Sequence, residues 1–209
     1  MQPFRLRPAI VAGLLSLLFL SAFVVAAPVP PAPATAAAAP EIVLTLDPAQ
    51  SKVHFIVDST LHTVHGTFAL KSGVVHFDPE TGKATGEIVV YAPSGESGSS
   101  SRDKRMHKEI LETARFPEVR FRPMQVEGKV GTSGASDVKL SGVFSIHGAD
   151  HELVAQIHAE FAGDHWKGTG KFSVPYVQWG IKDPSNFLLK VKPVVDVELE
   201  MAGEVQVPR

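Results

Sequence analysis

The sequence VKLSGVFSI, residues 138–146, carries an apolar side chain or a glycine at every second position, and most of the positions between them are polar. Successive side chains of a strand point to opposite faces of a sheet, so a period of two is typical of a strand with one buried face and one face in water. The stretch therefore predicts a β-strand that packs one face on a hydrophobic core.

The same alternation recurs along most of the chain beyond residue 50. Turn-forming residues separate several of the segments, among them Ser72-Gly73 and the run DPETG at 78–82. The alternation predicts about nine strands, and we place them at residues 53–57, 64–70, 75–77, 88–90, 119–121, 138–146, 153–161, 166–174 and 191–201.

One stretch departs from this period. Residues 102–112 place Met106 and Ile110 four positions apart among charged residues, which predicts an amphipathic helix whose apolar stripe covers part of the barrel. The helix should end before Phe116-Pro117, because the residue preceding a proline is pushed out of helical geometry. The basic cluster Arg102, Lys104, Arg105 and Lys108 is typical of a solvated helix face, and it could also attract an anionic lipid head group.

Strands with one apolar face either close into a barrel or stack as a sandwich. The C-terminal strands are about nine to eleven residues long, and glycines lie in the apolar phase at Gly66, Gly142, Gly168 and Gly170. Glycine at such positions permits the strong coiling of a barrel. We therefore predict an all-β fold with one short helix, an antiparallel β-barrel of about eight or nine strands. The glycines could also leave room for one small ligand, with coiling without a cavity as the alternative.

The first forty residues have the layout of a secretory leader. Arg5 and Arg7 precede a charge-free apolar run from residue 9 to 27, and a Pro/Ala tract follows. This predicts a signal peptide over residues 1–27, with cleavage sites as late as residue 39, a Pro/Ala-rich linker over 28–40 and one domain over 41–209. A periplasmic or secreted location follows. An uncleaved N-terminal anchor is the alternative, because about 20 apolar residues span a bilayer. We expect no contact with a membrane other than through such an anchor.

Composition excludes several classes of protein. The absence of cysteine removes disulfides, thiolate metal sites and cysteine nucleophiles. Of 20 Lys and Arg, two lie in the leader, and the remaining 18 face 22 Asp and Glu, a net charge of −4 with both signs interspersed. Such a surface gives no reason to expect nucleic acid as a partner.

Enzymatic and metal chemistry find little support. His62 and His65 lie three positions apart and His147 and His151 four apart, but no third ligand for zinc is evident. The sequence contains no GxSxG elbow, dinucleotide fingerprint or P-loop. Aspartates that precede proline, at 47, 78 and 183, are typical turn formers. We expect no catalytic residues, no metal and no cofactor.

The sequence also resembles the YceI-like family of bacterial periplasmic proteins. The resemblance begins with LDPAQSKVHF at 46–55, HGTF at 65–68 and residues 73–79, and continues through residues 102–106, FPEVRF at 116–121 and LSGVFSIHG at 140–148. It implies a lipocalin-like barrel in the periplasm and an association with polyisoprenoid lipids, and it implies no reaction. The segment PYVQWGIKD at 175–183 matches the family only loosely, which leaves the pocket rim and the identity of the ligand open.

Three functions remain. The first is a carrier that holds an apolar molecule, such as a polyisoprenoid or a quinone tail, inside the barrel. The second is an interaction protein with a filled barrel, whose partners dock on the Trp179 loop or the helix, and the third and weakest is an enzyme that uses a histidine such as His62 or His65 as a base. For the carrier we expect the ligand to be lined by Phe55, Phe68, Phe77, Phe121, Phe144, Phe172 and Trp179.

Overall fold

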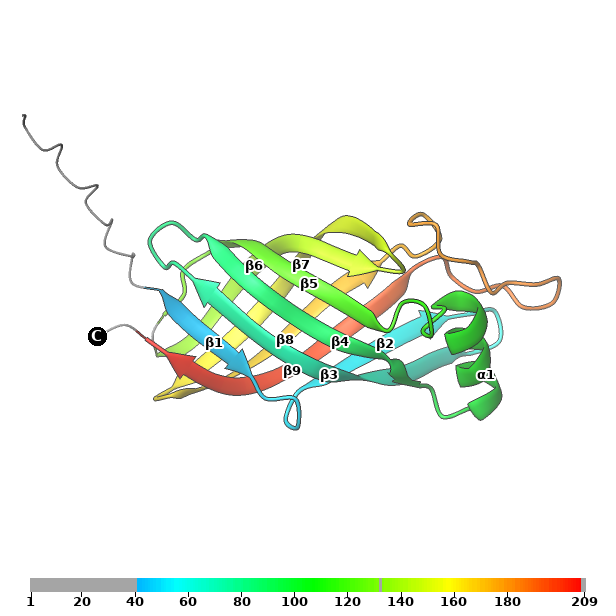
Figure 1. Cartoon of the computed structure of the whole chain (residues 1–209), viewed down its shortest axis with the longest axis horizontal. Helices are drawn as coiled ribbons and strands as arrows, with labels where there is room; N and C mark the ends of the chain where they lie inside the picture. The colour runs from blue at the N-terminus through cyan, green and yellow to red at the C-terminus, as the bar shows by residue number, and fades with distance from the viewer. Residues whose placement is uncertain (1–40, 132, 208–209) are drawn as a thin grey trace, which may run out of the picture. The chain divides into compact units, whose positions relative to one another are not determined.

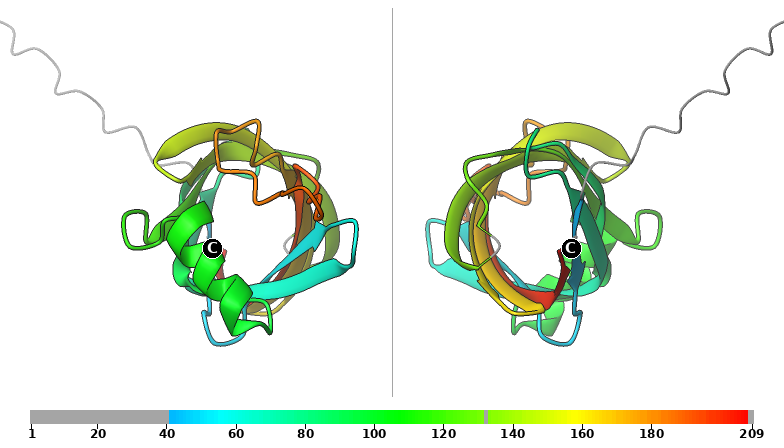
Figure 2. Two further views of the ribbon diagram at one scale, coloured as in Figure 1. Left: turned by 90° about the vertical axis from the view of Figure 1, so that its right-hand side faces the viewer. Right: turned by 90° about the vertical axis from the view of Figure 1, so that its left-hand side faces the viewer.

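The sheet closes into a barrel with eight strand positions around its circumference (Figures 1 and 2). The computed structural model describes residues 41–131 and 133–207. All strand pairs are antiparallel, and the ring runs β2-β9-β8-β7-β6-β5-β4-β3 and back to β2. The strands are β1 Ile42–Leu46, β2 Lys52–Asp58, β3 Thr63–Phe77, β4 Ala84–Glu96, β5 Glu118–Glu127, β6 Gly134–Ile146, β7 Ala149–Ala162, β8 His165–Val174 and β9 Val195–Gln206. The predicted antiparallel barrel with one short helix is confirmed.

The extra strand β1 shares one position of the barrel with β2. Both strands pair with β3 on one side and β9 on the other, β1 at one end of the barrel and β2 at the other. A turn at Asp47 separates them, where one carboxylate oxygen accepts a hydrogen bond from the Ala49 amide at 2.8 Å. The alternation did not reveal β1, because it is short and lies at the end of the apolar N-terminal tract.

The aspartates that precede proline form turns, as predicted. Asp78 accepts a hydrogen bond from the Glu80 amide at 2.9 Å, and Asp183 accepts one from the Ser185 amide at 2.8 Å. Side-chain hydrogen bonds from Thr81 and Ser185 lower the pKa of Asp78 and Asp183 respectively. These carboxylates therefore act in the turns and not as a pair.

Two predicted boundaries were wrong. Ser72-Gly73 does not form a turn, because β3 is one strand that absorbs the irregularity as a shift in its register with β4 between Leu70 and Ser72. Such bulges bend a strand without ending it. The last strand begins at Val195 and not at 191, because Pro193 cannot donate a backbone hydrogen bond to the sheet.

The predicted helix is present in two parts. Helix α1 covers Ser100–Arg105 and a π-helical turn, η1, covers Met106–Ile110, where the Leu111 amide donates to the Met106 carbonyl at 2.8 Å. The helical segment thus starts at Ser100, two residues before the predicted start. In the described part of the chain, no helix is long and apolar enough to cross a bilayer.

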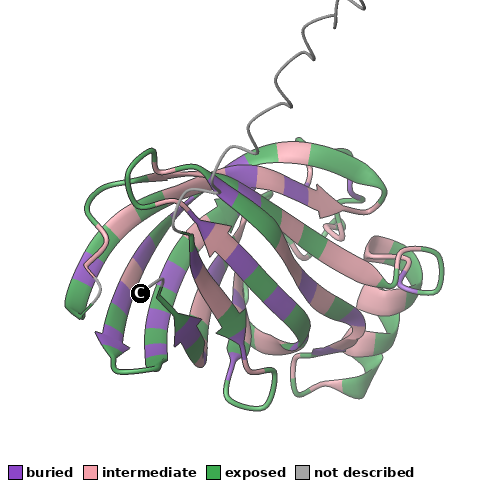
Figure 3. Cartoon of the chain, turned by 60° about the vertical axis from the view of Figure 1, so that its left-hand side comes forward, coloured by how far each residue is buried: buried purple, intermediate pink, exposed green. Residues whose placement is uncertain are grey.

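Buried and exposed residues alternate along the strands, as Figure 3 shows. A compact cluster fills the barrel end that carries β1, which we call the closed end; it includes Ile42, Phe77, Phe161 and Trp166. The helix and the loop at 175–194 lie at the opposite end (Figure 1). The closed end therefore leaves the other half of the barrel available for a ligand.

Candidate ligand-binding cavity

A cavity of about 700 Å³ occupies the half of the barrel that lies toward the helix. It reaches inward as far as Leu46, Ile157 and Met201 and outward to the mouth, which we define as residues 59–62, 97–111 and 182–192. This volume lies within the range of about 300–1,000 Å³ that is usual for small-molecule sites. The barrel is hollow over this length, so the filled-barrel interpretation does not describe it.

Five of the seven aromatic residues predicted to line the ligand do line the cavity. Two pairs of rings are in contact: Phe55 and Phe68 lie 5.2 Å apart between ring centroids, and Phe144 and Phe172 lie 5.7 Å apart. Phe121 contributes the fifth ring. The five rings come from β2, β3, β5, β6 and β8, so aromatic side chains line the cavity from several of its strands.

The other two predicted residues lie elsewhere. Phe77 is buried in the closed end, where it lines a separate void of about 80 Å³. Trp179 stacks on His151, with ring centroids 4.1 Å apart and planes 4° from parallel, and its ring lies 5.9 Å from that of Phe144. Phe77 therefore supports the closed end, and Trp179 braces the Phe144 wall without lining the cavity.

The apolar-phase glycines do not supply the space, contrary to the prediction. A Cβ atom at Gly66 would lie 2.2 Å from the Phe55 ring, and one at Gly142 would lie 2.8 Å from the Phe121 ring. A Cβ at Gly170 would lie 2.7 Å from a methyl group of Ile157. Large side chains thus already cover the glycines, and the cavity arises from the barrel's width.

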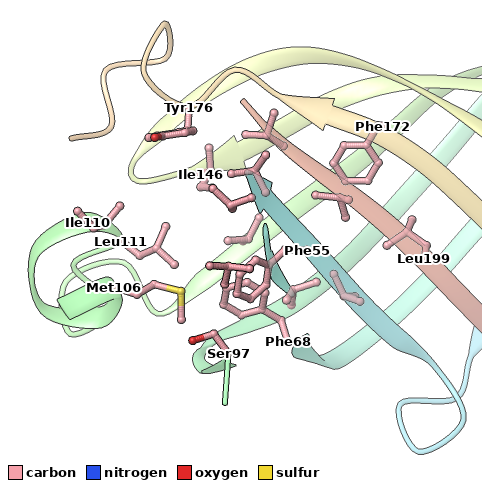
Figure 4. A pocket seen from close by; sticks show the side chains of 18 of the residues that line it. Phe55, Phe68, Ser97, Met106, Ile110, Leu111, Ile146, Phe172, Tyr176 and Leu199 are labelled. Atoms are coloured by element: carbon pink, nitrogen blue, oxygen red, sulfur yellow. The ribbon is translucent and has the colours of Figure 1, made fainter. Parts of the chain in front are cut away.

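The helix and the 175–194 loop add lining residues that the aromatic pattern did not indicate. Figure 4 shows Met106, Ile110 and Leu111 beside the barrel opening, and all three line the cavity. Met106 and Ile110 were predicted to face the barrel, and this is confirmed. Tyr176 and Ile181 from the loop are also buried lining residues, and no periodic signal marked them.

The Tyr176 hydroxyl is an isolated polar group in this lining. The side chain is 6% exposed, and the hydroxyl makes no hydrogen bond to any described residue. Burial raises the pKa of Tyr176 to about 12, with a smaller contribution from the charge of Asp183. The phenol is therefore neutral at physiological pH.

Two polar contacts connect the helix with the 175–194 loop across the mouth. Arg105 donates to the Pro184 carbonyl at 3.2 Å, and the Lys182 ammonium lies 3.1 Å from a Glu109 carboxylate oxygen. The hydrogen bond from Lys182 lowers the pKa of Glu109. These contacts hold the two segments together at the rim of the cavity.

The start of the helix is held by a compact polar network. Arg102 donates from Nε to the Ser97 hydroxyl and from Nη2 to the Ser97 carbonyl, both at 2.7 Å. Asp103 accepts from the Ser97 amide at 2.9 Å. Arg102 also lines the cavity, but its donors toward Ser97 are already used for structure.

The histidines considered as catalytic bases or metal ligands do not lie together in one site. His62 is exposed at the mouth, His65 is exposed on the outer face of β3, and His147 lies 3.6 Å from a Glu112 oxygen. Within residues 41–131 and 133–207, no three His, Asp or Glu side chains are placed to hold a metal ion. The absence of an enzymatic activity remains a prediction.

Comparison with known proteins agrees with this architecture. The model of the YceI-like domain matches residues 44–203. The chain belongs to the YceI-like family. The resemblance stated from the sequence is therefore confirmed over most of the barrel. No curated protein is similar enough in sequence to count as a relative.

Solved structures share the YceI-like fold at low sequence identity. BcnA of Burkholderia cenocepacia is 15% identical, with a TM-score of 0.63 over 76% of this chain and 99% of its own. A polyisoprenoid-binding domain from Saccharophagus degradans is 15% identical, with a TM-score of 0.58 over 79% and 98%. A YCEI protein of Campylobacter jejuni is 16% identical, with a TM-score of 0.53 over 68% and 84%. At this identity the likeness establishes the fold alone.

Proposed function

We propose that this YceI-like protein is an exported carrier that holds an isoprenoid-type lipid inside its barrel. The observation that carries the proposal is the cavity of about 700 Å³, which aromatic and aliphatic side chains line almost throughout. The polyisoprenoid-binding domain from Saccharophagus degradans, which has the same fold, supports this choice of ligand class.

Energetics favour a long apolar chain over a short one. Burying about 300 Å² of ligand surface contributes roughly 7 kcal/mol at 25 cal/mol per Å². Association costs at least about 4 kcal/mol in lost translational and rotational freedom. A short tail is therefore held weakly, and affinity should rise with each isoprene unit that the cavity can accommodate.

The ligand's polar end is best placed at the mouth. The inner end of the cavity is apolar, whereas Tyr176 and Arg105 lie among the lining residues near the opening. A buried donor without a partner is costly, so a ligand that supplies an acceptor to the Tyr176 hydroxyl gains over a pure hydrocarbon. We therefore place the tail inward and a hydroxyl, phenol or carbonyl head outward. A quinone would meet the same requirement.

Export is part of the proposal and rests on the leader, which lies outside the described residues. The charge-free run from residue 9 to 27 after Arg5 and Arg7 is its support. Intact-mass measurement of the protein from the periplasmic fraction should show the loss of at least residues 1–27. An intact leader on a protein recovered only from the cytoplasm would contradict export.

A chain-length series tests the binding function. Delipidated protein is titrated by calorimetry with geraniol, farnesol and geranylgeraniol, which differ only in the number of isoprene units. The expected result is an affinity that rises along the series, by up to several kcal/mol per unit at about 0.8 kcal/mol per buried CH₂. Absence of binding, or equal affinity for all three alcohols, would contradict an isoprenoid cavity.

A further inference from the structure

The most exposed large apolar side chains gather at the mouth. Phe187, Leu188 and Leu61 are 94%, 81% and 71% exposed, whereas Met124 and Val154 on the barrel wall reach only 58%. Apolar side chains this exposed and grouped on one face usually mark a contact surface. The cavity therefore opens among exposed apolar side chains that would be stabilised by removal from water.

The Phe187-Leu188 tip is held in a defined turn. The Asn186 amide donates to the Leu189 carbonyl at 2.8 Å. The Asn186 side-chain oxygen accepts from the amides of Leu188 and Leu189 at 2.9 and 2.8 Å. This turn places Phe187 and Leu188 at its apex. The orange loop between β8 and β9 protrudes beside the barrel opening in Figure 1.

Leu61 belongs to the same surface, although it comes from the β2–β3 connection. The Thr60 amide donates to the Lys190 carbonyl at 2.9 Å, and the Lys190 amide donates to the Thr60 hydroxyl at 3.2 Å. The Lys192 ammonium lies 2.6 Å from an Asp58 oxygen. Because these bonds join the two loops, the three apolar side chains are presented together.

Charge separates the mouth from the rest of the barrel. The mouth segments 59–62, 97–111 and 182–192 hold seven Lys and Arg against three Asp and Glu, a net charge of +4. The rest of residues 41–209 holds 11 against 19, a net charge of −8. Lys104, Lys108 and Lys190 are exposed and form no ion pair with a described carboxylate. The partner of this surface should therefore be anionic as well as apolar.

We infer that the mouth docks on the surface of an anionic phospholipid bilayer. Phe187, Leu188 and Leu61 enter the boundary between head groups and acyl chains, and the lysines lie at the level of the phosphates. A docked barrel has its cavity open toward the lipid, which gives a hydrophobic cargo a path that avoids water. The docking does not depend on the cargo being an isoprenoid, and the N-terminal leader takes no part in it.

Vesicle cosedimentation tests the inference. The protein without its leader is mixed with vesicles of phosphatidylcholine alone or of phosphatidylcholine with phosphatidylglycerol. We expect binding to the anionic vesicles only. The double variant Phe187→Ser/Leu188→Ser should bind at least about tenfold more weakly. Each of Lys104→Glu and Lys190→Glu should reduce binding about fivefold or more.

Matched variants on the barrel wall distinguish docking through the mouth from nonspecific adsorption to vesicles. Met124→Ser/Val154→Ser removes two exposed apolar side chains, and Lys139→Glu or Lys167→Glu reverses an exposed charge on the wall. These variants should bind anionic vesicles like the unmodified protein. Equal loss from wall and mouth variants would overturn the inference.

Three further outcomes distinguish the docking inference from the carrier function and from self-association. If the unmodified protein fails to bind anionic vesicles, docking is wrong even where isoprenoid alcohols bind the cavity. If the protein instead forms a dimer in vesicle-free solution, and Phe187→Ser/Leu188→Ser abolishes it, the apolar tip is a self-association surface. Loss of isoprenoid binding with retained vesicle binding would contradict the carrier function and leave the docking intact.

Discussion

Phe55 lies directly over Gly66 across the β2–β3 pair, and a Cβ atom at position 66 would approach the Phe55 ring to 2.2 Å and the Glu96 carbonyl oxygen to 2.4 Å. The glycine thus allows an aromatic wall residue to lie flat against its neighbouring strand. This contact, repeated by Phe121 over Gly142, sets the inner surface of the cavity.

Replacing these glycines should have unequal costs. Gly66→Ala should destabilise the protein by about 1–3 kcal/mol, because both an aromatic ring and a backbone carbonyl must move. Gly170→Ala is the matched variant and should cost less, because the nearest obstacle is the end of the flexible Ile157 side chain. Urea unfolding of both variants measures the difference. A Gly66→Ala protein as stable as the unmodified one would show that the ring contact is not fixed.

The helix stripe gives a second prediction. Met106→Asp should destabilise the protein by about 1–3 kcal/mol, because it brings a carboxylate into an apolar cavity. Lys108→Asp, on the exposed side of the same helical segment, should stay within about 0.5 kcal/mol of the unmodified protein. Thermal unfolding of both variants is the measurement, and equal damage would mean that the helix phase is wrong.

The Tyr176 hydroxyl gives a third prediction, about ligand choice. Tyr176→Phe should keep the stability of the empty protein or raise it slightly, because it removes a buried donor without a partner. The same change should weaken farnesol binding about fivefold and leave binding of the hydrocarbon farnesene unaffected, since a neutral hydrogen bond contributes about 1 kcal/mol. Calorimetric titration with both ligands measures this. Equal weakening of both would place the head group elsewhere.

Acid should loosen the contact between Glu109 and Lys182. The lowered pKa of Glu109 means that the folded protein favours the carboxylate, so this contribution to stability is present above the ordinary pKa near 4.5 and is lost as the pH falls through the lowered value. Glu109→Gln should therefore speed ligand release at pH 7 and make release less sensitive to acid. Glu160→Gln, on the outer wall, is the control. Stopped-flow fluorescence measures the rate of ligand release. The prediction is wrong if Glu109→Gln, like the control, releases ligand at the same rate as the unmodified protein.

The alternation of apolar and polar residues was enough to predict most of the strands, because inward side chains along a strand recur with a period of two. The choice of a barrel over a sandwich needed the length of the C-terminal strands and the glycines in the apolar phase as well. The spacing of four between Met106 and Ile110 predicted that both side chains face the barrel, because residues four apart share one face of a helix. The period could not separate a lining ring from a packing ring, so Phe77 and Phe172 appeared equivalent although one belongs to the closed end.

The lining residues that come from loops could not be predicted from sequence patterns. Tyr176 enters the cavity because the segment after β8 folds back over the opening, and its position depends on contacts with distant residues such as the one between Arg105 and Pro184. The glycine argument failed for a similar reason. A glycine in the apolar phase indicates close approach of something, but only the structure identifies it as an aromatic ring.

Organic extraction followed by mass spectrometry of the purified protein tests the carrier function most directly. Leu199 lines the cavity from β9, and Glu200, the next residue, is exposed on the outer face. Leu199→Trp should fill part of the cavity and reduce the copurified isoprenoid lipid several-fold without lowering the melting temperature, whereas Glu200→Trp should retain the lipid. An unmodified protein that yields no lipid, together with a Leu199→Trp protein that loses about 1–3 kcal/mol of stability as a packed core would, contradicts the account.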